Sequence, residues 1–224
     1  IASAGLAKYF QKIFISQEIG ADKPEKAYFD ACFAKIPGFE REKLHLATSV
    51  RSFRTPDLAA FVKAVLDADT DEAKLLYQRI KDKYPIVITR DLQKAKKWVR
   101  DHCQGTTRYG LLASSGAIRL KPEGIFVKNE ISVANWFLNG KDDVRSSYML
   151  EDVVTEFDIQ GLELDYSVVA WDADYRYADG EWTYNNFVGN RWNSVGSEER
   201  RLYLKNAYRV LLTRARQGMA IFVP

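Results

Sequence analysis

The sequence lacks several features that would place it in a familiar class at once. It contains only two cysteines, Cys32 and Cys103, which are far apart and have no neighbouring cysteine or histidine at metal-ligand spacing. This argues against a disulfide-stabilised secreted domain or a zinc site, and predicts free thiols in a reducing cytoplasm. No apolar run approaches the ~20 residues of a membrane span, so we expect no membrane segment.

A phosphate-binding loop of the form G-x-x-x-x-G-K-[ST] is also missing. The only Gly-Lys pair, Gly140-Lys141, is followed by Asp142 and has no glycine five residues upstream. Because such a loop wraps backbone N–H groups around the phosphates, this stretch of chain cannot form that type of nucleotide site by itself.

The composition is that of a globular protein with no strong electrostatic preference. Apolar residues make up 46% of the 224 residues, enough for one good-sized domain with a packed core. The net charge of +3 permits a nucleic-acid partner without requiring one. One local basic run, Lys94, Lys96, Lys97 and Arg100 on a predicted helix, either is an ordinary solvated face or follows phosphates.

The pattern of apolar residues changes along the chain. Residues 1–45 have mostly helical spacing, and a short strand over 44–48 and a helix over 57–66 follow. After Pro85, compact apolar strands alternate with amphipathic helices. The strands are predicted at 86–89, 110–113, 167–171 and 219–223, and the helices at 71–83, 92–102 and 198–214. This alternation predicts an α/β fold with a parallel sheet, whose post-strand loops share one end.

An aromatic stretch over residues 171–192 interrupts this pattern. It surrounds Asp179-Gly180, a dipeptide typical of tight β-hairpin turns. The favoured interpretation is that cross-strand aromatic pairs bury a small insertion. The other is a surface on which bases stack, with Trp182 and Tyr184 as the candidate nucleic-acid-binding residues.

Two short motifs carry the functional information. Residues 155–165 read TEFDIQGLELD, and residues 209–216 read RVLLTRAR. They resemble motifs V and VI of superfamily 1 helicases, whose usual forms are T-x-H-x-x-Q-G-x-E-[FL] and Y-V-A-L-T-R-A-[KR]. The sequence departs from these forms at Phe157, where the histidine is expected, and at Arg209, where the tyrosine is expected. The segment 47–52, ATSVRS, more weakly resembles motif IV, N-Y-R-S.

The resemblance implies roles for particular residues. Arg214 falls at the position of an arginine finger on ATP, and Arg51 at that of a second phosphate-sensing arginine. Glu163, with Gly161 and Gln160 in the turn before it, falls where relatives contact the nucleotide. Thr155 falls where they contact the nucleic-acid backbone. For Arg214 the structural alternative is an arginine that complements a helix C-terminus, and for Arg51 a surface arginine in a turn. Gly161 is suited either to a positive φ or to a close backbone approach.

A closer resemblance covers roughly residues 45–224. The blocks 108–115, 119–125, 135–138, 145–148 and 155–171 are similar to a bacterial DNA/RNA helicase domain family of unknown function, related to the helicase-like C-terminal part of Schlafen proteins. This implies a RecA-like sheet flanked by helices, of the P-loop NTPase type but without its own phosphate loop, over 46–224, with a hairpin insertion at 171–192. Residues 1–45 would join it to a first motor domain.

The expected function follows from that resemblance. The chain would be the C-terminal motor domain of an ATP-dependent helicase or translocase acting on single-stranded or duplex nucleic acid. In the full-length parent, this domain would bind ATP and Mg²⁺ together with the N-terminal RecA-like domain of the same chain. This part of the chain alone would bind neither tightly. The alternative is a non-enzymatic nucleic-acid- or protein-binding module that keeps the motor fold.

Overall fold

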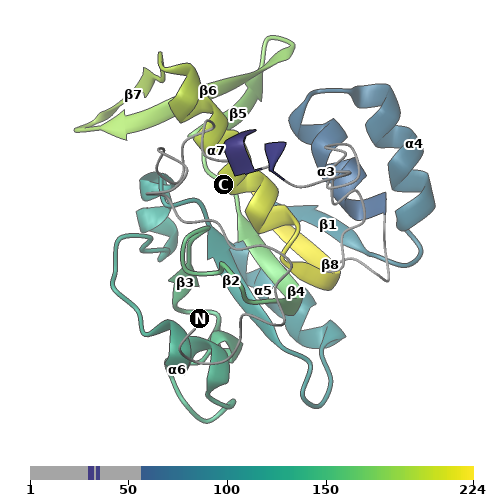
Figure 1. Cartoon of the computed structure of the whole chain (residues 1–224). Coiled ribbons are helices and arrows are strands. Elements are labelled where there is room, and N and C mark those ends of the chain that lie inside the picture. The colour runs from purple at the N-terminus through teal and green to yellow at the C-terminus, as the bar shows by residue number, and fades with distance from the viewer. Residues whose placement is uncertain (1–29, 33, 36–56) are drawn as a thin grey trace. The chain divides into compact units, whose positions relative to one another are not determined.

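The computed structural model describes residues 30–32, 34–35 and 57–224 (Figure 1). The chain divides into two compact units, residues 1–47 and 48–224, and residues 57–224 are the described part of the second. Arg51 and the strand predicted at 44–48 lie outside the described residues, so both stay predictions.

A five-stranded parallel sheet forms the centre of this unit (Figure 1). Its strands are β1 (Ile86–Thr89), β2 (Tyr109–Ala113), β3 (Val153–Val154), β4 (Leu164–Ala170) and β8 (Ala215–Phe222), and their order across the sheet is β1-β8-β4-β2-β3. All five residues of β2 are buried, which explains its unbroken run of apolar and small side chains. The predicted parallel α/β fold is confirmed.

Helices cover both faces of the sheet. Successive residues of a strand point to opposite faces, so Val169 belongs to one buried cluster with α3 (Asp57–Leu66) and α7 (Glu198–Leu212). Its neighbour Val168 belongs to a second cluster with α5 (Leu92–His102). The remaining helices are α4 (Thr70–Ile80), α6 (Val133–Leu138), η3 (Ile118–Glu123) and η4 (Ser147–Met149).

Local signals set the helix starts. The side chain of Asp91 accepts a hydrogen bond from the backbone N–H of Lys94 at 3.0 Å and caps α5. Ser197 caps α7 in the same way through the N–H of Arg200 at 3.4 Å. Among the described residues, no helix is long and apolar enough to cross a bilayer.

The aromatic stretch forms a separate antiparallel sheet of β5 (Tyr175–Ala178), β6 (Glu181–Val188) and β7 (Arg191–Ser194). Asp179 has φ 52° and Gly180 φ 89°, the pair of positive angles that a type I′ hairpin turn requires. The predicted hairpin is therefore confirmed, and a third strand extends it.

Two strands start earlier than predicted. β4 begins at Leu164 rather than Ser167, and β8 begins at Ala215 rather than Met219. The reason is mutual pairing, because Leu164 lies opposite Ala215 in the ladder. Arg216 and Gln217 are polar, so the pattern of apolar residues does not predict that β8 extends over them. The two-residue β3 is too short to produce any periodicity.

Candidate functional site

The strands of a parallel sheet all point the same way, so the sheet has an amino end and a carboxyl end. At the amino end, Glu163 comes directly before β4 and Arg214 directly before β8. The backbone N–H of Leu164 donates to the carbonyl oxygen of Arg214 at 3.1 Å. This bond joins the two helicase-like motifs, which are about 50 residues apart in the sequence.

Charged side chains surround this junction. Arg214 is buried, at 5% exposure. Arg216 is half exposed; its Nη2 lies 2.9 Å from Asp165 Oδ1, and its Nη1 lies 3.9 Å from Glu163 Oε2. The structure thus brings Arg214 and Glu163 to the same end of the sheet, and Arg216 links the acidic residues on either side of Leu164.

The turn before Glu163 depends on a glycine. Gly161 has φ +81°, and a Cβ placed there would meet nothing within 4 Å. Its positive φ is therefore confirmed as the reason for glycine, rather than a close approach of another group. Gln160 does not share a site with Arg214 and Glu163; it lines a cavity that extends from the carboxyl end of the sheet.

Thr155 lies at the carboxyl end, immediately after β3. Its backbone N–H and its hydroxyl both donate to Asp158 Oδ2, at 2.8 and 2.7 Å. The N–H of Ile159 donates to the Thr155 carbonyl at 3.0 Å, which closes a helix-like turn. Thr155 therefore starts this turn, and its contact with nucleic acid stays a prediction.

The hairpin residues Trp182 and Tyr184 pack against the body of the domain. The Trp182 indole donates to the Val65 carbonyl at 2.9 Å, and its ring stacks on Tyr175 with centroids 4.4 Å apart. The guanidinium of Arg201 lies 5.8 Å from the Tyr184 ring centroid. These contacts support the interpretation of structural packing, and base stacking by Trp182 and Tyr184 stays a prediction.

The basic helix α5 also has partners within the chain. Lys96 is buried and pairs with Glu151 at 3.1 Å, while Lys97 pairs with Asp101 at 2.7 Å. Arg100 donates to a backbone carbonyl at 2.9 Å. These cations serve local structure, which favours the ordinary interpretation of the basic run.

A cavity of about 780 Å³ lies at the carboxyl end, and we refer to it as the carboxyl-end cavity. The residues that follow β2, β3 and β4 meet there. Ser115 donates through its backbone N–H and its hydroxyl to the two carboxylate oxygens of Glu156, at 2.8 and 2.7 Å. The remaining wall comes from β6 and from the exposed side of α7.

Asp174 also lines this cavity, and it is an unusual residue because its acidic side chain is buried, at 1% exposure. Its Oδ1 accepts from the Tyr208 hydroxyl at 2.5 Å and from the backbone N–H of Tyr175 at 2.9 Å. Its Oδ2 has no hydrogen-bond partner of acceptable geometry among the described residues. Burial raises the pKa of Asp174 to about 7, against the lowering effect of hydrogen bonding from Tyr208 and the nearby Ser114 hydroxyl.

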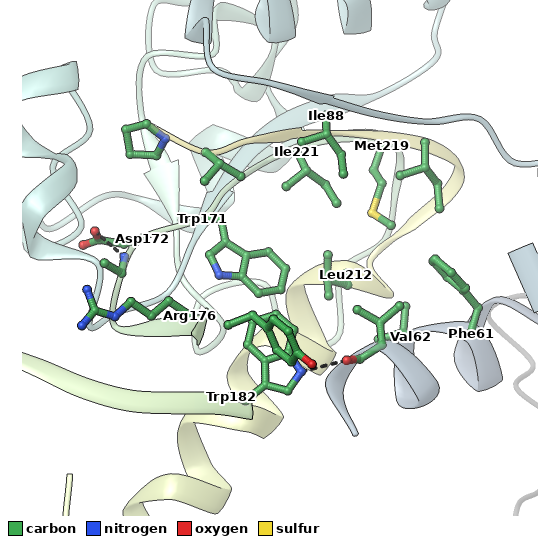
Figure 2. A pocket seen from close by; sticks show the side chains of 16 residues that line it. Phe61, Val62, Ile88, Trp171, Asp172, Arg176, Trp182, Leu212, Met219 and Ile221 are labelled. Carbon is green, nitrogen blue, oxygen red and sulfur yellow. Dashed lines mark hydrogen bonds between the residues drawn. The ribbon is translucent and has the colours of Figure 1, made fainter. Parts of the chain in front are cut away.

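A second, apolar pocket of about 480 Å³ lies between α3, β1, β8 and the hairpin (Figure 2). Figure 2 shows Trp171 and Trp182 at its centre, with Leu212 and Val62 near them and Ile221 and Met219 beyond. Ile88, on the strand at the edge of the sheet, is 72% exposed. The lining is mostly apolar, and Asp172 and Arg176 are its charged members.

Sequence reasoning missed Asp174 and Glu156. A usable signal was present, because polar residues follow each buried strand at Ser114-Ser115, Thr155-Glu156 and Asp172 to Asp174. The carboxyl ends of parallel strands share one end of the sheet, which is where α/β proteins commonly bind ligands. In the described part of the chain, no group of three histidine, cysteine or acidic side chains could hold a metal ion.

Two comparisons with known proteins bear on the two helicase-like motifs. A search of curated proteins finds no match. Residues 9–224 match the family model described as Schlafen group 3, DNA/RNA helicase domain. The match spans the described sheet, both helicase-like motifs, the carboxyl-end cavity and the aromatic hairpin. The chain therefore belongs to the Schlafen group 3 DNA/RNA helicase domain family.

Proposed function

We propose that this domain is the second motor domain of an ATP-dependent superfamily 1 helicase or translocase. Nucleotide would bind at the amino end of the sheet and nucleic acid at the carboxyl end. The observation that carries the proposal is the 3.1 Å backbone bond from Leu164 to Arg214, because it places the motif V glutamate beside the motif VI arginine. The helicase family match supports it.

The amino end offers chemistry that fits the phosphates of a nucleotide. An arginine is permanently charged and can contact two phosphate oxygens at once, so Arg214 would stabilise the charge that develops during phosphoryl transfer. Because Arg214 is 5% exposed, this role requires its side chain to become accessible when a first motor domain closes on this one. The described residues offer no metal-ligand cluster, so Mg²⁺ would be held by that first domain.

The segment from Thr155 to Glu163 would couple the two ends of the sheet. Thr155 follows β3 at the carboxyl end and Glu163 precedes β4 at the amino end, so this short segment runs between the two proposed binding regions. Its turn is held by Asp158 and by the positive φ of Gly161. Movement of Glu163 on nucleotide binding would therefore shift the Thr155 turn toward or away from nucleic acid.

The test uses a protein that contains both motor domains. Arg214→Ala should lower kcat for ATP hydrolysis by roughly 10³–10⁵-fold while nucleotide binding changes little, because an arginine finger acts mainly on the transition state. Arg214→Lys should restore little activity, since a point charge does not reproduce the fork of the guanidinium.

The matched control is Arg79→Ala, which removes an exposed arginine from the last turn of α4 and should leave hydrolysis unchanged. Near-normal ATPase activity in Arg214→Lys would refute the role of Arg214. A parent protein that binds nucleic acid but hydrolyses no ATP would favour the alternative of a non-enzymatic binding module.

A further inference from the structure

We propose that the carboxyl-end cavity holds one unstacked nucleobase of a single-stranded nucleic acid, whose exocyclic amino group donates a hydrogen bond to Asp174. This inference rests on the nucleic-acid half of the proposed function and specifies where a base is held and which bases fit. Apart from Glu156, Phe157, Gln160 and Val210, the residues that line the cavity lie outside both helicase-like motifs.

The cavity has the size and the location for such a ligand. Its volume of about 780 Å³ falls within the ~300–1,000 Å³ of small-molecule sites, and it accommodates a base with its sugar. It lies where the post-strand loops of β2, β3 and β4 meet, beside the turn that Thr155 starts. A strand that passes Thr155 could therefore place a base in the cavity.

Asp174 supplies the specific contact. Its carboxylate is fixed, because Tyr208 and the backbone of Tyr175 hold Oδ1. Among the described residues, its Oδ2 is a buried acceptor without a hydrogen-bond partner of acceptable geometry, and it lies close to Gly116, where an added Cβ would meet it at 3.0 Å. Because Oδ2 is buried in this structure, a ligand N–H reaches it only when the neighbouring loop at Gly116 shifts; the contact then satisfies a buried acceptor, which makes it both favourable and selective.

The charge of the cavity indicates a base rather than a phosphate. Asp174 and Glu156 are both acidic, and Ser115 already occupies the two oxygens of Glu156. An anionic phosphate would be repelled here, whereas a neutral heterocycle with an amino group would be accepted. Arg200 is the cation of the lining and is exposed on α7, which suits it to the phosphate that follows the base.

Exposed aromatic rings at the cavity supply a stacking surface. Phe157 is 68% exposed and Tyr203 is 65% exposed, although both line the cavity. The hydroxyl of Tyr203 donates to Glu199 at 3.2 Å, which restrains its ring on the outer side of α7. Aromatic side chains of this kind receive unstacked bases in proteins that bind single strands. Phe157 occupies the motif V position at which the usual form has histidine.

The experiment measures fluorescence anisotropy at pH 8 with the 224-residue chain and short single strands of about 15 nucleotides. Three oligothymidines differ only at the central position, which carries thymine, cytosine or no base. The cytosine strand should bind about tenfold more tightly than the thymine strand, as expected for one hydrogen bond to a base that carries an amino group. The abasic strand should bind most weakly.

Two variants test the assignment. Asp174→Asn should abolish the preference for cytosine, whereas Asp179→Asn, which removes a carboxylate from the exposed hairpin turn, should retain it. Phe157 is exposed, so Phe157→Ala should leave the fold intact. The variant should bind the base-containing strands about tenfold or more weakly, and the salt dependence of its affinity should not change.

The outcomes separate the inference from the proposed function. Equal binding of all three strands, or a cytosine preference that persists in a folded Asp174→Asn, overturns the base site and leaves nucleic-acid binding intact. If no strand binds at low salt, nucleic-acid binding by this domain fails, and the base site fails with it.

Discussion

The buried carboxyl group of Asp174 makes the stability of the fold depend on pH. Its pKa rises from 3.8 in the ordinary environment to about 7 in the folded chain, chiefly because burial penalises the charged form. The folded state therefore retains this proton at pH values where the unfolded state has lost it. The resulting stabilisation is complete below pH ~4 and is lost as the pH rises through about 7.

The magnitude follows from the difference between the two pKa values. About three pH units at 1.36 kcal/mol each give an upper limit of about 4 kcal/mol. This is a large part of the ~5–15 kcal/mol that stabilises a typical domain. Asp172 contributes in the same direction, because burial raises its pKa as well. The free energy of unfolding should thus be lower at pH 8 than at pH 5.

Asp174→Asn isolates this contribution. We expect the variant to lose most of the decline between pH 5 and pH 8, because its amide does not ionise. The measurement is urea unfolding followed by tryptophan fluorescence at several pH values, with Asp179→Asn as a control that should follow the wild-type profile. Parallel profiles for Asp174→Asn and the wild type, both with two-state unfolding, would refute the reasoning.

Two further outcomes test other parts of the structure. The 224-residue chain alone should release no phosphate from ATP above background, because it lacks a phosphate loop and its described residues lack a metal site. ATPase activity that survives repurification and is lost in Arg214→Ala would contradict this prediction. Trp182→Phe should lower the free energy of unfolding by about 1 kcal/mol, because the hydrogen bond to the Val65 carbonyl is lost, and Trp182→Ala should lower it by about 3–5 kcal/mol. Urea unfolding measures both changes. An unchanged unfolding midpoint in Trp182→Ala would show that the stacking of Trp182 on Tyr175 does not support the fold.

Several features were predictable because their causes are local. The apolar runs at 86–89 and 110–113 form β1 and most of β2, and Asp91 caps α5. Asp179-Gly180 forms the hairpin turn, since the two residues tolerate positive φ. Gly161 adopts a positive φ within a motif that the resemblance had already identified. In each case the deciding interactions involve residues only a few positions apart.

The amino-acid sequence by itself determined the alternation of strands and helices, the hairpin and the two helicase-like motifs, because periodicity, capping and turn geometry act over short distances. Only the tertiary structure decided that Arg214 is buried, that β8 begins at Ala215, and that Asp174 faces a cavity with one carboxylate oxygen that has no hydrogen-bond partner of acceptable geometry in the described part of the chain. Each of these depends on groups that are distant in the sequence: Leu164 pairs with Ala215, and Tyr208 holds Asp174 from a different element. Burial and electrostatic environment arise from the sum of such contacts, which no local pattern contains.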